Sequence, residues 1–167
     1  MKKSKIILTL VFISLQLSLI AQENANKTMR SFVPKSKAYD IYYPLDFKIN
    51  EDDNGIVSIS NPTSGINITI STYRLAKKIN DAVLIDLINS FINETYKKKH
   101  KVEDWNSYKT KFDNVVRLKT YFEKTNWYWF GINDKKSIVI LSVNKESEIT
   151  PEELNLVEFM INSLIFN

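Results

Sequence analysis

The 167-residue sequence contains no cysteine, one histidine, three glycines and four prolines. The absence of cysteine excludes disulfide bonds, thiolate nucleophiles, cysteine zinc sites and lipid attachment at a cysteine behind a leader. The single histidine, His100, cannot supply the two imidazole ligands of a typical zinc site, and no serine lies in a G-x-S-x-G pattern. We therefore predict no catalytic residue, no metal site and no cofactor, and packing alone must stabilise the fold.

The amino terminus has the pattern of a secretory signal. Three lysines precede the apolar run Ile6–Leu15, and a softer stretch leads to Ala21. Polar residues dilute this segment, whereas a membrane-spanning helix needs about 20 predominantly apolar residues. We predict that residues 1–21 are a cleaved leader and not a permanent anchor, so the protein is exported to the periplasm or the cell exterior.

Removal of this leader changes the charge. The whole chain has 23 basic and 19 acidic side chains, a formal charge of +4, and loss of the three leader lysines reduces it to +1. A polyanion-binding protein is expected to keep a basic surplus on one face. Nucleic acid is therefore excluded as a partner, and a protein partner is expected.

The remaining chain has the length of one domain. Residues 22–37 are polar and show no apolar period, which predicts a second, polar leader between the cleaved signal and the domain, without regular structure. The folded domain is predicted to span residues 38–167, enough to bury a core without cross-links.

Strand patterns dominate the first part of this domain. Tyr39–Tyr43 and Phe47–Ile49 are short runs of strand formers, and Asn54–Gly55 is a strong hairpin signal between apolar segments. The acidic cluster around that turn lacks the alternating ligands of a calcium loop. In Ile66–Ser71 isoleucines alternate strictly with polar residues, which predicts a strand with one core face and one polar face.

Two segments have the helical period. Ile79–Lys98 places its apolar residues on one side, and the basic cluster at its end suits the carboxyl terminus of a helix, with a phosphate or headgroup role as the alternative. Thr150–Glu153 has the pattern of a capping box and opens a second amphipathic helix. Further strands are predicted at Trp105–Phe112, Val115–Lys124, Trp127–Ile132 and Ser137–Val143.

The element order predicts an α+β domain. We expect an antiparallel sheet of about seven or eight strands, with an amphipathic helix after the fourth strand and a helix at the carboxyl terminus. Ser137–Val143 is apolar on both faces, which predicts a central strand covered on both sides. The expected architecture is an α/β/α-type sandwich.

From about Tyr39 onward the sequence resembles the PsbP-like superfamily, with its DcrB-like and Ran-release-factor-like branches. The resemblance rests on Tyr42–Ile49, on Asn61–Tyr73 and on the terminal Ile161–Phe166. It implies the PsbP fold and a role in binding or assembly rather than catalysis. Phe47 stands where the family often has tryptophan, and no functional residue of the family has a counterpart here.

The aromatic run Trp127–Phe130 is the candidate binding surface. In a strand the two tryptophans point to one side, and Tyr128 and Phe130 point to the other, so at least one pair enters a core. The second pair either packs under a helix or forms an exposed platform. Ile132 extends the Tyr128 side, so the expected platform is Trp127 and Trp129, with Tyr121 nearby.

Three functions fit these observations. The first is a non-catalytic, exported domain that binds a protein in the cell envelope. The alanine–glutamine junction at the leader, together with many Ile, Asn and Lys residues, resembles exported proteins of Bacteroidetes bacteria. The second is a periplasmic immunity protein that neutralises a secreted toxin. The third is an envelope hydrolase whose paired carboxylates are not visible in the sequence.

Overall fold

The computed structural model describes residues 29–77, 79–96, 101–102, 106–108, 110–112, 115–134 and 137–167. The predicted leader, residues 1–21, lies outside this range, as do His100, Trp105 and most of the lysine cluster near the first helix. Within the described part of the chain, no helix is long and apolar enough to cross a membrane.

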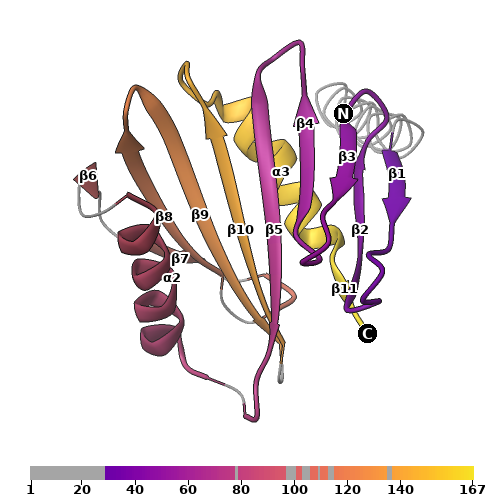
Figure 1. Ribbon diagram of the computed structural model, residues 1–167, viewed down its shortest axis with the longest axis vertical. Coiled ribbons are helices and arrows are strands. Elements are labelled where there is room, and N and C mark those ends of the chain that lie inside the picture. The colour runs from indigo at the N-terminus through magenta and orange to yellow at the C-terminus, as the bar shows by residue number, and fades with distance from the viewer. Residues whose placement is uncertain are drawn as a thin grey trace, which may run out of the picture.

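Two antiparallel sheets and two helices make up the described fold, which confirms the predicted α+β class (Figure 1). The large sheet has the strand order β3-β4-β5-β10-β9-β8-β6, and β7 also pairs with β8. Its strands are β3 (Lys48–Glu51), β4 (Val57–Asn61), β5 (Ile66–Arg74), β6 (Lys101–Val102), β7 (Asn106–Tyr108), β8 (Val115–Phe122), β9 (Thr125–Asp134) and β10 (Ser137–Lys145). A small sheet, in the order β1-β2-β11, contains β1 (Met29–Phe32), β2 (Tyr39–Pro44) and β11 (Ile165–Phe166).

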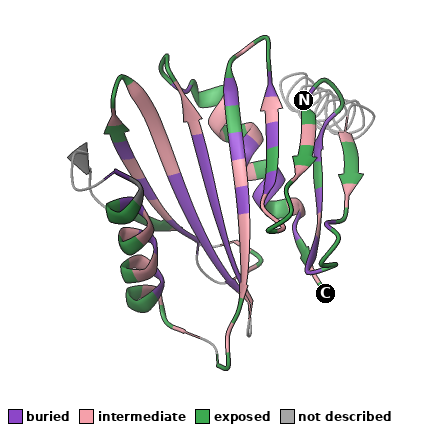
Figure 2. Ribbon diagram, viewed as in Figure 1, coloured by how far each residue is buried: buried purple, intermediate pink, exposed green. Residues whose placement is uncertain are grey.

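The large sheet is covered on both faces, as predicted. Helix α2 (Asp81–Tyr96) packs on one face, over β8 and β9, while α3 (Pro151–Ser163) and the small sheet pack on the other (Figure 1). Strand β10 lies between β5 and β9 and is buried along most of its length (Figure 2). Its side chains alternate between the two cores: Ile138 and Ile140 face α2, whereas Val139, Leu141 and Val143 face α3.

Local sequence signals explain the helix starts. The side-chain oxygen of Asn80 accepts a hydrogen bond of 3.0 Å from the backbone N–H of Val83 and so caps α2. Helix α3 begins with the predicted capping box: Thr150 Oγ1 accepts from the Glu153 N–H at 3.3 Å, and the Glu153 carboxylate accepts from the Thr150 N–H at 2.9 Å. Both helices are therefore fixed at their amino ends by residues visible in the sequence.

The fold begins earlier than the sequence predicted. Residues 22–37 were expected to be a leader without structure, but β1 pairs along its length with β2. The small sheet was not foreseen either, because it joins β1 and β2 to β11, more than 120 residues away in the sequence. Strand pairing between such distant segments leaves no local periodic signal.

The turn between β8 and β9 also differs from the prediction. The expected turn at Thr125 and Asn126 is part of β9, and the chain instead reverses at Glu123 and Lys124. Both turn residues have positive φ, 46° and 69°. Positive φ at both positions matches the right-handed twist of the strands that a two-residue hairpin turn connects. Glutamate and lysine do not favour positive φ, so the pairing of β8 with β9 imposes this conformation on them.

Candidate functional site

The predicted platform of Trp127 and Trp129 is wrong in one respect: Trp129 is packed under α2 and not open to solvent, and Trp127 is open only in part. Trp129 is only 7% exposed and Trp127 is half-buried. Their rings stack with centroids 5.5 Å apart, and Tyr96 of α2 packs edge-on against both. The face of β9 that carries the tryptophans is the face on which α2 lies, a tertiary choice that alternation alone does not decide.

Tyr121 is the exposed member of the predicted surface, at 47%. It occupies the position on β8 that follows buried Thr120, so its side chain points to the face opposite the tryptophans. The structure therefore does not bring Tyr121 together with Trp127 and Trp129, and the three residues do not form one surface.

A different group of exposed apolar side chains lies on the outer face of the small sheet. In β2, Tyr39, Ile41 and Tyr43 point into the core, so Tyr42 points outward and is 44% exposed. Two further exposed apolar side chains come from elements that contact β2, Ile165 of β11 at 49% and Phe159 of α3 at 39%. We call Tyr42, Phe159 and Ile165 the outer patch.

The elements that carry the outer patch are linked to one another at β2. The Tyr42 N–H donates a 2.9 Å hydrogen bond to Ser163 Oγ, which ties β2 to the end of α3. Phe159 is four residues before Ser163 and therefore lies on the same helix face. Ile165 pairs with Asp40, whose side chain shares the outward face of β2 with Tyr42.

The sequence contained only part of the signal for this patch. Alternation from Tyr39 would have placed Tyr42 outside once β2 was recognised as a one-sided strand. The position of Ile165 could not be found in this way, because the helical pattern of the last segment runs close to the chain end. Its exposure follows from the pairing of β11 with β2, a contact between the two ends of the domain.

Charged side chains serve to attach α3 to the large sheet. Lys145 Nζ lies 2.7 Å from Glu153 Oε1, and Arg117 lies 3.1 Å from Glu158. Among the described residues no carboxylate belongs to the buried set, and no three acidic or histidine side chains gather as they would around a metal ion. The described residues therefore offer no buried carboxylate in support of the hydrolase hypothesis.

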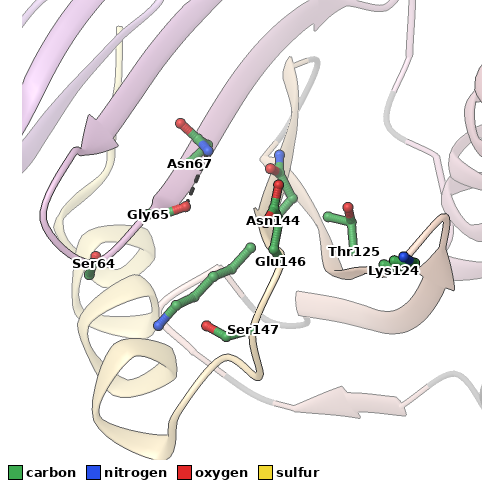
Figure 3. A pocket seen from close by; sticks show the side chains of 9 residues that line it. Ser64, Gly65, Asn67, Lys124, Thr125, Asn144, Glu146 and Ser147 are labelled. Atoms are coloured by element: carbon green, nitrogen blue, oxygen red, sulfur yellow. Dashed lines mark hydrogen bonds between the residues drawn. The ribbon is translucent and has the colours of Figure 1, made fainter.

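A polar cleft of about 750 Å³ lies at one end of the large sheet, where the β4–β5 turn, the β8–β9 turn and the end of β10 meet (Figure 3). Asn67 and Asn144 come from neighbouring strands and are paired in register. Lys124 and Glu146 are exposed side chains of opposite charge at its rim. The lining is otherwise mostly hydroxyl and amide groups, which suits hydrogen bonding rather than acid–base chemistry.

Comparison with solved structures identifies the architecture. The cyanobacterial PsbP protein of Synechocystis sp. PCC 6803, CyanoP, matches with a TM-score of 0.65 and 8% identity, over 84% of this chain and 93% of its own. The chain has the PsbP fold. The Saccharomyces cerevisiae Ran-binding protein Mog1p shares it, with a TM-score of 0.57 and 10% identity, over 83% of this chain and 95% of its own.

The PsbP fold accounts for nearly the whole described chain, and it confirms the resemblance seen in the sequence. No family model matches the sequence, and no curated protein sequence matches it significantly. At 8–10% identity the likeness concerns the fold and not individual residues. Function must therefore be argued from the surfaces of this chain.

Proposed function

We propose that this chain is an exported, non-catalytic binding domain, and that its partner is a protein that docks on the outer patch. One observation carries the proposal: Tyr42, Phe159 and Ile165 are large apolar side chains, each more than a third exposed, on elements that meet at β2. Exposed apolar clusters of this kind mark interaction sites, and tyrosine and phenylalanine are enriched in protein interfaces.

Two further points support a protein partner. The three side chains of the patch are uncharged, and the carboxylate of Asp40, which shares their face, accepts a 2.9 Å hydrogen bond from Asn167 Nδ2, so a partner would not bury a carboxylate without a hydrogen bond. In addition, one of the solved structures compared above, Mog1p, is a Ran-binding protein by name. The export part of the proposal rests on the predicted leader, residues 1–21, and on a mature charge near zero.

The experiment is affinity purification of the full chain from cells that produce it naturally, with mass spectrometry of the mature amino terminus and of co-purified proteins. An exported chain should begin at Gln22, immediately after Ala21. A candidate partner is then purified and its affinity measured for the wild type and for a Tyr42→Ser/Phe159→Ser variant. Loss of two aromatic anchors should weaken binding at least about 100-fold.

Two control variants separate the outer patch from other surfaces. Val83→Ser removes an apolar side chain of α2 that is 48% exposed and lies outside the patch. Tyr121→Ser removes the exposed member of the surface predicted from sequence. Both should bind like the wild type. Full affinity in the patch variant, with an unchanged melting temperature, would contradict the proposed site, and retention of the leader in mature protein would contradict export.

A further inference from the structure

The α2-side face of the large sheet contains an ordered polar array that α2 does not cover. Register places Ser60, Asn67 and Asn144 in one row across β4, β5 and β10, and Ser58, Thr69 and Ser142 in the next. The first row ends at Trp127 of β9, and the second ends at Trp129. We call the six serine, threonine and asparagine residues the polar face.

The polar face is open because α2 lies over the neighbouring strands. The helix packs on β8 and β9 (Figure 1). The members of the apolar cluster beneath it that belong to β10 are Ile138 and Ile140. Ser58 and Asn67 are exposed, Ser60, Thr69 and Asn144 are half-buried, and Ser142, in register with Trp129, is buried. Neighbouring strands are about 4.8 Å apart, and alternate residues along a strand are about 6.7 Å apart. The six side chains therefore form a closely spaced two-by-three grid.

Most of the hydrogen-bonding groups in this grid are unused. Asn67 Nδ2 donates to the Gly65 carbonyl at 3.3 Å (Figure 3). Among the described residues, no other side-chain hydrogen bond involves the remaining five members of the polar face. Water satisfies such groups in the free protein, and a ligand that replaces the water must offer matching donors and acceptors.

The chemistry of the grid favours a neutral, hydroxyl-rich ligand over a protein. All six side chains are uncharged. At the adjoining cleft Lys124 and Glu146 have opposite charges and Lys145 is paired with Glu153, while exposed Lys48 of β3 lies in register beside Ser60 at the edge of the grid. Serine is depleted in protein interfaces, and serine and threonine are under-represented among their hot spots. Hydroxyl and amide groups are, in contrast, suitable partners for the many hydroxyls of a sugar.

Two features extend the face in directions useful for a glycan chain. The row of Asn67 and Asn144 leads directly into the 750 Å³ cleft, which adds further hydroxyl groups from Ser64, Thr125 and Ser147. At its other side the same row ends at Trp127, a half-buried indole whose apolar surface suits the carbon face of a sugar. Polar contacts along a groove with an aromatic border can hold several successive residues of a chain.

We propose that the polar face and its adjoining cleft form a binding site for a neutral oligosaccharide. This site is separate from the outer patch, so it does not depend on the identity of the protein partner. Because none of the six grid side chains is charged, affinity should change little with salt concentration.

The test is titration of the purified protein with four neutral hexasaccharides, of the cello-, malto-, manno- and chito- series, followed by two-dimensional NMR. At least one sugar should shift the side-chain amide signals of Asn67 and Asn144 in a saturable way, with a dissociation constant in the millimolar range or below. Asn67→Ala/Asn144→Ala should weaken binding about tenfold, because two hydrogen bonds are lost. Asn155→Ala/Asn162→Ala, which changes two exposed asparagines of α3, is the matched control and should not weaken it.

Several results would overturn the proposal. One is no saturable shift with any of the four sugars in a protein whose spectrum shows that it is folded. A second is equal affinity of the Asn67→Ala/Asn144→Ala variant and the wild type. A third is a strong loss of affinity with salt, which would indicate an ionic ligand held by Lys124. A fourth is protection of the polar face, instead of the outer patch, by the purified protein partner.

Discussion

Ile88 of α2 lies directly over Gly131 of β9, so closely that a Cβ atom at position 131 would be 2.7 Å from Ile88 Cδ1. The same atom would be 2.8 Å from a methyl carbon of Val116 and 2.9 Å from Leu84 Cγ. These distances are too short for any side chain. Gly131 therefore sets how near α2 can approach the sheet, and the tryptophans on the same strand face are covered as a consequence.

Gly131→Ala should destabilise the protein by about 1–3 kcal/mol, because the added methyl group overpacks this core. Urea unfolding followed by circular dichroism measures the loss. Ile88→Val removes the nearest atom, so combining it with Gly131→Ala should cost less than the sum of the two single changes. Strict additivity would show that α2 does not rest on Gly131.

The capping box of α3 gives a second prediction. Thr150→Ala removes the hydroxyl that accepts the Glu153 N–H and should lower the free energy of unfolding by about 1 kcal/mol. Thr150→Ser keeps a capping oxygen and should be close to the wild type. If both variants were equally destabilised, the cap would not be the source of the effect, and loss of the threonine methyl group would explain it instead.

Tyr108 is expected to contribute to a loss of stability at alkaline pH. Burial, and to a smaller extent the charge of Glu158, raise the pKa of the Tyr108 phenol to about 12, while Arg117 opposes the rise. The unfolded chain releases this proton near pH 10 and the folded chain only near pH 12. Stability from this group is thus complete below pH 10 and falls as the pH rises toward 12.

Tyr108→Phe tests this assignment. The phenol oxygen is buried and has no hydrogen-bond partner among the described residues, so its removal should not destabilise the protein at neutral pH. The variant should also lose less stability than the wild type between pH 10 and 12, as measured by thermal unfolding. An identical alkaline decline in both proteins would assign it to other groups.

Sequence pattern was sufficient to predict an element whose structure is determined by residues that are neighbours in the sequence. The alternation of Ile66, Ile68 and Ile70 predicted a one-sided strand, and all three side chains are buried. The capping box at Thr150 likewise predicted the start of α3, because the residues that cap a helix are neighbours in sequence. The run Ser137–Val143, apolar on both faces, predicted that both faces of the sheet are covered.

The candidate surfaces were less predictable because each depends on contacts between elements that are far apart in the sequence. Tyr42 is outside because β2 joins the end of the chain, where its N–H meets Ser163. The polar side chains of Ser142 and Asn144 lie in a strand predicted to be apolar on both faces, and they belong to a site only because β5 lies beside them. The burial of Trp129 was decided by where α2 packs, which periodicity does not encode.

The hydrogen bond between Trp129 and Thr120 tests whether the tryptophan pair is part of the core. Trp129 Nε1 donates to Thr120 Oγ1 at 3.1 Å, and both side chains are buried. Thr120→Val keeps the shape but leaves the indole N–H unsatisfied, which should cost about 1–3 kcal/mol, while Thr120→Ser keeps the acceptor and should cost less. Were Trp129 an open platform, water would replace the threonine and Thr120→Val would be nearly neutral. Urea unfolding of the two variants therefore distinguishes a packed tryptophan from an exposed one by their difference in stability.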